Sequence, residues 1–176
     1  MSKLDTIAEL IQGQRGKPPI DKWHPDLSGD IDIVIRSDGR WFHEGGEIKR
    51  HELVKLFASI LRREADGDYY LVTPVEKWRI QVEDLPLQII DAEIEPDRIG
   101  VLTNVDDWCI LGESRPLVVS TDSDSGEPRP QVELDHGLSA RVARAVFYRL
   151  VDEAEVDAGQ LWLQSQGQRF SLGRTE

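Results

Sequence analysis

Hydrophobic residues recur at helical spacing in three parts of the chain. The pattern predicts helices over 2–12, 49–64 and 138–154, each with one apolar face and one polar face. The apolar faces comprise Leu4, Ile7, Ala8 and Ile11 in the first helix, Leu53, Leu56, Phe57, Ile60 and Leu61 in the second, and Val142, Val146, Phe147, Leu150 and Val151 in the third. The first helix is too short to be stable alone, so we expect it to dock on another surface.

Elsewhere apolar and polar residues alternate, which predicts strands. A hairpin over 30–43 turns at Ser37-Asp38-Gly39, and a second hairpin spans 69–82 with a turn near Pro74. Further strand-like runs cover 87–94, 98–103, 107–111 and 116–121, and a polar loop follows at 122–130. A last hairpin, 160–165 with 169–172, turns at Gln166-Gly167.

The second and third helices and the hairpins after them look alike. The segment 56–61 corresponds to 146–151, and 69–72 corresponds to 161–164. We therefore predict an α+β fold with two similar strand–helix–hairpin motifs, an internal repeat of curled, mostly antiparallel sheets each packed by one helix. The alternative is that two ordinary amphipathic units share the pattern by coincidence. The expected organisation is an N-terminal helix and connector, 1–17, and two α+β repeat domains, 18–86 and 87–176.

Composition and charge narrow the class of protein. The chain has 176 residues and a net charge of −12, with 39% hydrophobic residues and one cysteine. These values indicate a folded, cytoplasmic protein without disulfides, and they argue against nucleic acid or an anionic membrane as a partner. No apolar run approaches the length of a membrane span, and the first 30 residues lack the apolar region of a secretory signal.

The negative charge is concentrated in the second half. Residues 1–88 carry 13 basic and 16 acidic side chains, whereas residues 89–176 carry 8 and 17 and contain no lysine. Six acids and no base lie between Glu83 and Asp97. They either form a face that selects basic partners or protect a strand edge from aggregation, and their alternation with apolar residues favours the second interpretation.

The sequence offers little sign of catalysis. His43 and His51 do not have the spacing of a metal site, and the Asp122–Gly126 segment lacks half of the ligands of a calcium loop. Cys109 lies in an apolar run, as a packing thiol does. Asp30 and Asp32 share one strand face and could act as an acid–base pair of a hydrolase, although we favour the interpretation that they form the solvated face of the hairpin. We predict no catalytic residues, no metal and no cofactor.

One basic cluster stands out. Arg62 and Arg63 are expected to end the second helix, where cations complement the helix dipole, and Lys77 and Arg79 lie on the following hairpin. An alternative function is an anion site, because paired arginines can contact a phosphate or carboxylate through two hydrogen bonds. The residues assigned to such a site are Arg62, Arg63, Lys77, Tyr70 and Trp41.

Several of these segments together resemble a known bacterial family. They are Gly29-Asp30-Ile31-Asp32-Ile33, Leu53 to Glu64, Tyr70 to Lys77, Pro128-Arg129-Pro130 and Arg144 to Val151. They are similar to DUF1285, a family of unknown function, over roughly residues 18–173. The resemblance implies an α+β fold with repeated motifs and no established activity, and a role in signal transduction has been suggested for such proteins from their fold.

Three hypotheses about function follow. The first is a regulatory or signal-transduction module that binds a protein partner or a small anionic ligand. The second is a hydrolase that uses Asp30 and Asp32. The third is an adaptor that docks through the helix at 2–12.

Overall fold

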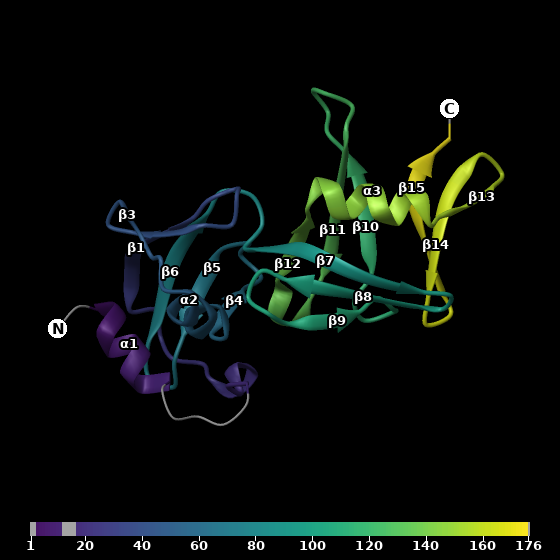
Figure 1. The fold of residues 1–176 in the computed structure, drawn as a ribbon. Coiled ribbons are helices and arrows are strands. Elements are labelled where there is room, and N and C mark those ends of the chain that lie inside the picture. Colours follow the sequence, from purple (N-terminus) through teal and green to yellow (C-terminus); the bar gives the residue numbers. More distant parts are fainter. Residues whose placement is uncertain (1–2, 12–16, 176) are drawn as a thin grey trace. The chain divides into compact units, whose positions relative to one another are not determined.

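The chain divides into two compact units, Met1–Pro86 and Leu87–Glu176. The structure, a computed structural model shown in Figure 1, describes residues 3–11 and 17–175. In the described residues, strands dominate both units, and the α-helices are short.

The first unit is one six-stranded sheet with two α-helices. Its elements are α1 (Lys3–Ile11), the 3-10 turn η1 (Ile20–Lys22), β1 (Gly29–Ile35), β2 (Trp41–His43), β3 (Gly46–Glu47), α2 (His51–Ala58), β4 (Leu61–Arg63), β5 (Tyr69–Val72) and β6 (Lys77–Val82). The sheet order is β3-β2-β1-β6-β5-β4, so two antiparallel three-stranded meanders meet at the centre. There the first strand, β1, runs parallel to the last, β6.

The core of this unit follows from the alternation of apolar residues along β1. Ile31, Ile33 and Ile35 are buried, whereas Asp30 and Asp32, which alternate with them, are exposed. On the neighbouring β2, Trp41 stacks against Phe57 of α2, with ring centroids 6.4 Å apart. Helix α1 contacts α2 and buries Leu4, Ile7 and Ala8. The predicted ends of this helix, Ser2 and Gln12, lie outside the described residues.

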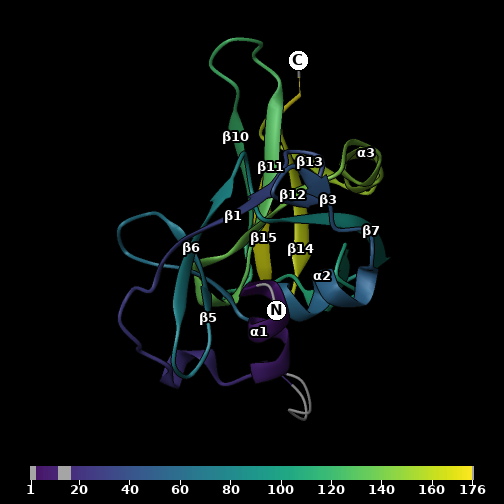
Figure 2. The ribbon, with the colours of Figure 1, turned by 90° about the vertical axis from the view of Figure 1, so that its left-hand side faces the viewer.

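The second unit contains a six-stranded and a three-stranded sheet. Its elements are β7 (Leu87–Glu95), β8 (Arg98–Thr103), β9 (Trp108–Ile110), β10 (Leu117–Thr121), β11 (Pro128–Glu133), the 3-10 turn η2 (Asp135–Gly137), β12 (Ser139–Val142), α3 (Arg144–Asp152), β13 (Glu155–Asp157), β14 (Gln160–Ser165) and β15 (Gln168–Arg174). The larger sheet has the order β10-β11-β12-β7-β8-β9, and the smaller one β13-β14-β15. Figures 1 and 2 show the β10–β11 hairpin projecting beyond the body of this unit.

The three-stranded sheet is held to the larger one by a buried hydroxyl. Ser165 is fully buried; its Oγ accepts a hydrogen bond from the Ile99 N–H at 2.9 Å and donates one to the Leu111 carbonyl at 2.7 Å. The β14–β15 hairpin turns at Gln166-Gly167, and both residues have positive φ, 53° and 76°. This mirror-image turn matches the twist of the strands, as the sequence predicted.

The two large sheets have the same topology. In each, a first meander of three strands and a second meander of three strands meet through a parallel pair formed by the first and the last strand. The two similar mixed sheets are consistent with a repeat. The helices, however, occupy different places in the two units: α2 connects the two meanders of the first sheet, whereas α3 follows the last strand of the second. The hairpin β14–β15, which the sequence aligned with β5–β6, belongs to the separate small sheet.

Three predicted boundaries are wrong. The helix predicted over 49–64 ends at Ala58, and 61–63 form strand β4; the helix predicted over 138–154 is strand β12 followed by α3. The apolar residues at these ends satisfy helical spacing by chance, because pairing of β4 with β5 and of β12 with β7 and β11 overrides local preference. The polar loop predicted over 122–130 is shorter, because β11 begins at Pro128.

Candidate functional site

Charged and aromatic side chains form a row across four neighbouring strands of the first sheet. Arg62 on β4 lies opposite Tyr70 on β5, Tyr70 lies opposite Arg79 on β6, and Arg79 lies beside Asp30 on β1. Residues at paired positions point to the same face of a sheet, so the four side chains lie side by side. The local meander β4–β5–β6 and the distant strand β1 thus assemble the site together.

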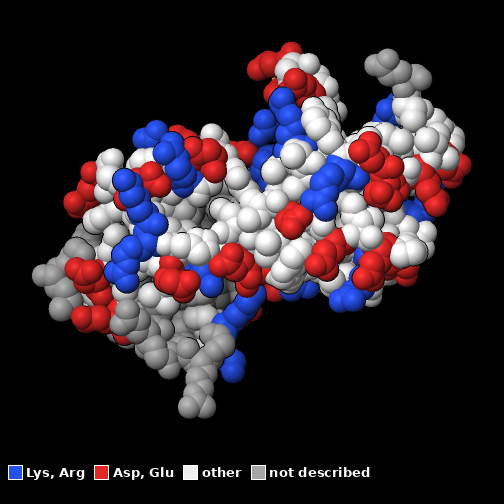
Figure 3. Space-filling view, viewed as in Figure 1, with Lys and Arg blue, Asp and Glu red and all other residues white. Residues whose placement is uncertain are grey.

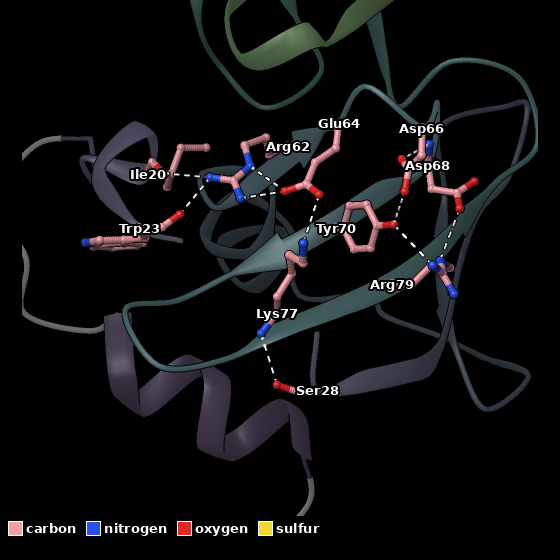
Figure 4. A network of polar contacts seen from close by, with 10 residues as sticks. All are labelled: Ile20, Trp23, Ser28, Arg62, Glu64, Asp66, Asp68, Tyr70, Lys77 and Arg79. Atoms are coloured by element: carbon pink, nitrogen blue, oxygen red, sulfur yellow. Dashed lines mark hydrogen bonds and ion pairs between the residues drawn. The ribbon is translucent and has the colours of Figure 1, made fainter. Parts of the chain in front are cut away.

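Glu64 directly follows the edge strand β4 and bridges two cations (Figure 4). One of its carboxylate oxygens, Oε2, accepts hydrogen bonds from Arg62 Nη2 at 2.6 Å and Nε at 3.2 Å, and the other accepts one from Lys77 Nζ at 2.9 Å. The Arg62, Lys77 and Glu64 side chains are 12%, 18% and 24% exposed. Partial burial strengthens such charge-assisted hydrogen bonds, so the three residues form a tight carboxylate-binding arrangement.

Arg62 also holds the segment before β1 against the sheet. Its Nη1 donates to the carbonyls of Ile20 and Trp23, both at 2.9 Å (Figure 4). Further along the segment, the Ser28 N–H donates to the Lys77 carbonyl at 2.7 Å, and Ser28 Oγ accepts from the Lys77 N–H at 3.1 Å. Arg62 therefore links a loop, a strand and a carboxylate.

Tyr70 occupies the middle of the row with its ring between two cations. Lys77 Nζ lies 4.8 Å and the Arg79 guanidinium 5.5 Å from the ring centroid. The Tyr70 hydroxyl donates to Asp66 and accepts a hydrogen bond from Arg79 Nη2 at 3.2 Å. Arg79 also forms ion pairs with Asp30 and Asp68, at 3.1 and 3.2 Å. Each of the three cations Arg62, Lys77 and Arg79 thus contacts at least one carboxylate.

These contacts shift the pKa values of three side chains in the site, Glu64, Asp66 and Tyr70. Burial alone would raise the pKa of Glu64, but the hydrogen bonds from Lys77 and Arg62 outweigh it and hold its pKa below the ordinary value of 4.5. The hydrogen bond from Tyr70, followed by that from the Asp68 N–H, lowers the pKa of Asp66. The same Tyr70–Asp66 hydrogen bond raises the pKa of the Tyr70 hydroxyl.

A pH dependence of stability follows from the lowered pKa of Glu64. The unfolded chain binds this proton more readily than the folded one, so the stabilisation is complete above about pH 5 and is lost as the pH falls through and below 4.5. We expect Glu64→Gln to reduce the slope of the free energy of unfolding against pH between 3 and 5, measured by urea unfolding. Glu44→Gln, which removes one exposed carboxylate elsewhere in the unit, is the control. An unchanged slope in Glu64→Gln would contradict this account.

The structure brings together three of the five residues assigned to the site. Arg62, Lys77 and Tyr70 share the network, whereas Arg63 points to the other face of β4, where its guanidinium lies 5.3 Å from the Tyr69 ring centroid. Trp41 is 1% exposed and belongs to the core. Arg62 and Arg63 do not end a helix, so the expected interaction with a helix dipole is wrong; both lie on β4.

The site also contains residues that the sequence interpretation left out. Glu64, Asp66 and Asp68 follow β4 and supply the carboxylates for the cations. The spacing of Arg62 and Glu64, two residues apart, is a signal that could have placed both on one strand face. That signal was hidden by the helix predicted over this segment.

The other candidate chemistry has no comparable geometry. Asp30 pairs with Arg79, and Asp32 is exposed on the same strand. Within residues 3–11 and 17–175, no group of three or more His, Cys, Asp or Glu side chains could hold a metal ion. Helix α1 has its apolar residues Leu4, Ile7 and Ala8 buried within its own unit, so an adaptor role for this helix would have to use its polar side. No helix in the described part of the chain has the length and apolar character needed to cross a membrane.

Comparisons with known proteins point to one family. The family model for the N-terminal domain of DUF1285, a domain of unknown function, matches residues 18–85, and the model for its C-terminal domain matches residues 86–172. The crystal structure of a DUF1285 family protein from Silicibacter pomeroyi DSS-3 is similar, with a TM-score of 0.91 and 39% identity over 99% of this chain and 96% of that chain. A DUF1285 family protein from Shewanella baltica OS155 gives a TM-score of 0.56 and 32% identity over 70% of this chain and 92% of that chain. No curated protein matches the chain.

Proposed function

Because the chain belongs to the DUF1285 family, for which no activity is established, we propose from its own geometry that it is a regulatory binding module rather than an enzyme. Its first unit binds a small anionic ligand at the Arg62–Lys77 pair. The observation that carries this proposal is the Glu64 carboxylate, which both cations bind. The two Glu64 oxygens stand in for oxygens of a phosphate or carboxylate group of the ligand.

The ligand must displace the Glu64 carboxylate from Arg62 and Lys77. This competition determines which chemical groups the ligand can carry. A phosphate monoester carries a charge of about −1.5 to −2 at neutral pH and three acceptor oxygens, whereas Glu64 offers one negative charge and two oxygens. Arg62 provides a planar fork and Lys77 a point charge, the two kinds of donor that phosphate groups use. The Tyr70 ring is buried beside Lys77 and supports the position of its ammonium group. We therefore expect a phosphorylated small molecule to compete with Glu64 better than a monocarboxylate does.

The test uses inorganic pyrophosphate and acetate as probes, with calorimetry on the full chain. We expect pyrophosphate to bind, acetate to bind far more weakly, and Glu64→Gln to bind pyrophosphate about tenfold more tightly because the internal competitor is lost, one unit of log K corresponding to about 1.4 kcal/mol. Lys77→Met should abolish binding. Arg115→Ala, which removes a cation that pairs with Asp135 in the second unit, should leave it unchanged. If Glu64→Gln is folded and no more able than the wild type to bind pyrophosphate, the network is structural and the proposal fails.

The topology of the two six-stranded sheets supports a second proposal, which concerns how they are related. We propose that the two six-stranded sheets arose by duplication of one pair of meanders, and that each is packed by one helix. In support, the strand order and the direction of all five strand pairings are the same in both sheets. Phe57 of α2 is buried against Trp41, and α3 lies against β7.

A further inference from the structure

The outer face of strands β7, β8 and β9 combines exposed apolar and acidic side chains. Trp108 on β9 is opposite Leu102 on β8, which is opposite Asp91 on β7; Ile110 is opposite Gly100, which is opposite Glu93. Because opposite residues share a face, one surface carries apolar groups over β8 and β9 and a row of carboxylates along β7. Glu95, two residues beyond Glu93, lies opposite Arg98 on β8, so Glu93 is the carboxylate of this row with no cation opposite it or paired with it in the described residues.

Trp108 is the largest apolar side chain of this surface. Its side chain lies over Gly100: a Cβ at position 100 would be 3.6 Å from Trp108 Cε3 and 3.6 Å from Ile110 Cδ1. Even so, Trp108 remains 49% exposed, while Leu102 and Ile110 are partly buried. A large aromatic ring fixed on a sheet and half open to solvent is typical of the anchor of a binding surface.

The carboxylates of this surface favour a positively charged partner. Asp91 is already paired with Arg149 of α3, at 2.7 Å, but Glu93 is exposed and forms no ion pair with another residue in the described parts of the chain. Strand spacing places β7 about 10 Å from β9, within the span of one basic side chain that rests on the Trp108 ring. On the side of the second unit seen in Figure 3, acidic side chains are interspersed with basic and uncharged ones. Residues 89–176 carry 17 acidic and 8 basic side chains, which attract a cationic partner over longer distances.

The strand order of the sheet favours a partner segment in an extended conformation. Strand β9 is the last strand of its sheet, so its outer edge is available for an added strand. An extended peptide there gains backbone hydrogen bonds, and its alternate side chains point to the face that holds Trp108 and Glu93. A second copy of the chain fits less well, because a symmetric dimer would bring the same acidic rows together. Nucleic acid is repelled by the same charge.

We propose that this surface, defined by Glu93, Leu102, Trp108 and Ile110, binds an extended basic segment of a partner protein, with a Lys or Arg side chain on the Trp108 ring. This surface belongs to the second unit and does not depend on the anion site of the first. It gives the molecule a place to bind a partner besides the ligand site.

The test is the binding of nine-residue synthetic peptides in which Lys or Arg alternates with Thr or Val, compared with the same peptides carrying Glu. Fluorescence anisotropy at low salt gives affinities, and NMR of the tryptophan indole N–H groups identifies Trp108 as the contact. We expect basic peptides to bind and acidic ones not to bind, with a loss of about tenfold or more in Trp108→Ala and in Glu93→Lys. Glu93→Lys changes an exposed residue and tests the proposal if Trp108→Ala fails to fold. Val156→Ala and Asp124→Lys, exposed changes on other elements, are the matched controls.

Two results would overturn the proposal. One is that no basic peptide binds, or that binding is the same in Trp108→Ala, Glu93→Lys and the controls. The other is self-association of the wild type that is lost in Trp108→Ala while no peptide binds, which would assign the surface to a second copy of this chain.

Discussion

Trp41→Ala is expected to lower the free energy of unfolding of the first unit by about 3–5 kcal/mol. The Trp41 side chain is 1% exposed and stacks on Phe57, so its removal leaves a cavity between β2 and α2. Urea unfolding of the full chain, followed by tryptophan fluorescence and circular dichroism, measures the loss. Pyrophosphate binding to the remaining folded protein should not change, which separates a core role from the ligand role that the sequence assigned to Trp41.

Trp41→Phe is the matched control for this variant. The Trp41 Nε1–H is buried and has no hydrogen-bond partner among residues 3–11 and 17–175, so phenylalanine removes an unsatisfied donor while keeping most of the aromatic contact. We expect a clearly smaller loss than in Trp41→Ala. If Trp41→Ala is as stable as the wild type and its affinity for pyrophosphate is altered, Trp41 belongs to the site after all.

Arg62→Ala is expected to lower the free energy of unfolding by about 3 kcal/mol, which is the order of cost of removing one partner from a largely buried charged network. The change removes the donor to the Ile20 and Trp23 carbonyls and leaves Glu64 with Lys77 alone. The segment before β1 should then open more often. Trypsin cleavage after Lys22, an exposed residue of that segment, should accelerate at least tenfold, measured by mass spectrometry.

Arg62→Lys keeps the charge but lacks the planar fork, so it cannot serve two carbonyls and a carboxylate together. We expect an intermediate rate of cleavage after Lys22. Equal cleavage rates in the wild type and Arg62→Ala would show that other contacts, such as those of Ser28 with Lys77, are sufficient to hold the segment.

Local pattern predicts the hairpins of this fold well and predicts the ends of its helices poorly. Strand β1 and the Gln166-Gly167 turn follow from alternation and turn chemistry alone. By contrast, Ile60 and Leu61 satisfy helical spacing and also fit a strand, and only the pairing of Leu61 with Leu71 decides between the two. Information about that pairing is not present in the segment itself.

Strand β11 shows a second reason for a wrong boundary. Pro128 and Pro130 favour a loop, because proline cannot donate a backbone hydrogen bond. In the structure β12 pairs only with Gln131 to Glu133, so the two prolines lie where β11 has a neighbour on one side alone, β10. Arg141 Nη1 donates a hydrogen bond to the Pro130 carbonyl at 3.2 Å, which gives this carbonyl a partner.

The candidate site could be predicted only in part for the same reason. The basic residues Arg62, Lys77 and Arg79 and the aromatic Tyr70 are close in sequence, so they could be grouped from the sequence. That Asp30 joins them depends on the parallel pairing of β1 with β6, strands separated by more than forty residues. The bond between Arg62 and the Ile20 carbonyl likewise joins residues 42 positions apart.

The parallel pair of first and last strands has a consequence for the order of folding. Neither sheet can be completed until its last strand, β6 or β12, has left the ribosome, because only that strand pairs the two meanders. Contacts of such long sequence separation make folding slow relative to helical proteins of the same size. Until synthesis passes Val82, β1 and β5 both have an unpaired edge that exposes apolar residues to other chains. Each unit therefore passes through a stage of synthesis at which unpaired strand edges expose it to aggregation, and a chaperone that covers those edges would protect it.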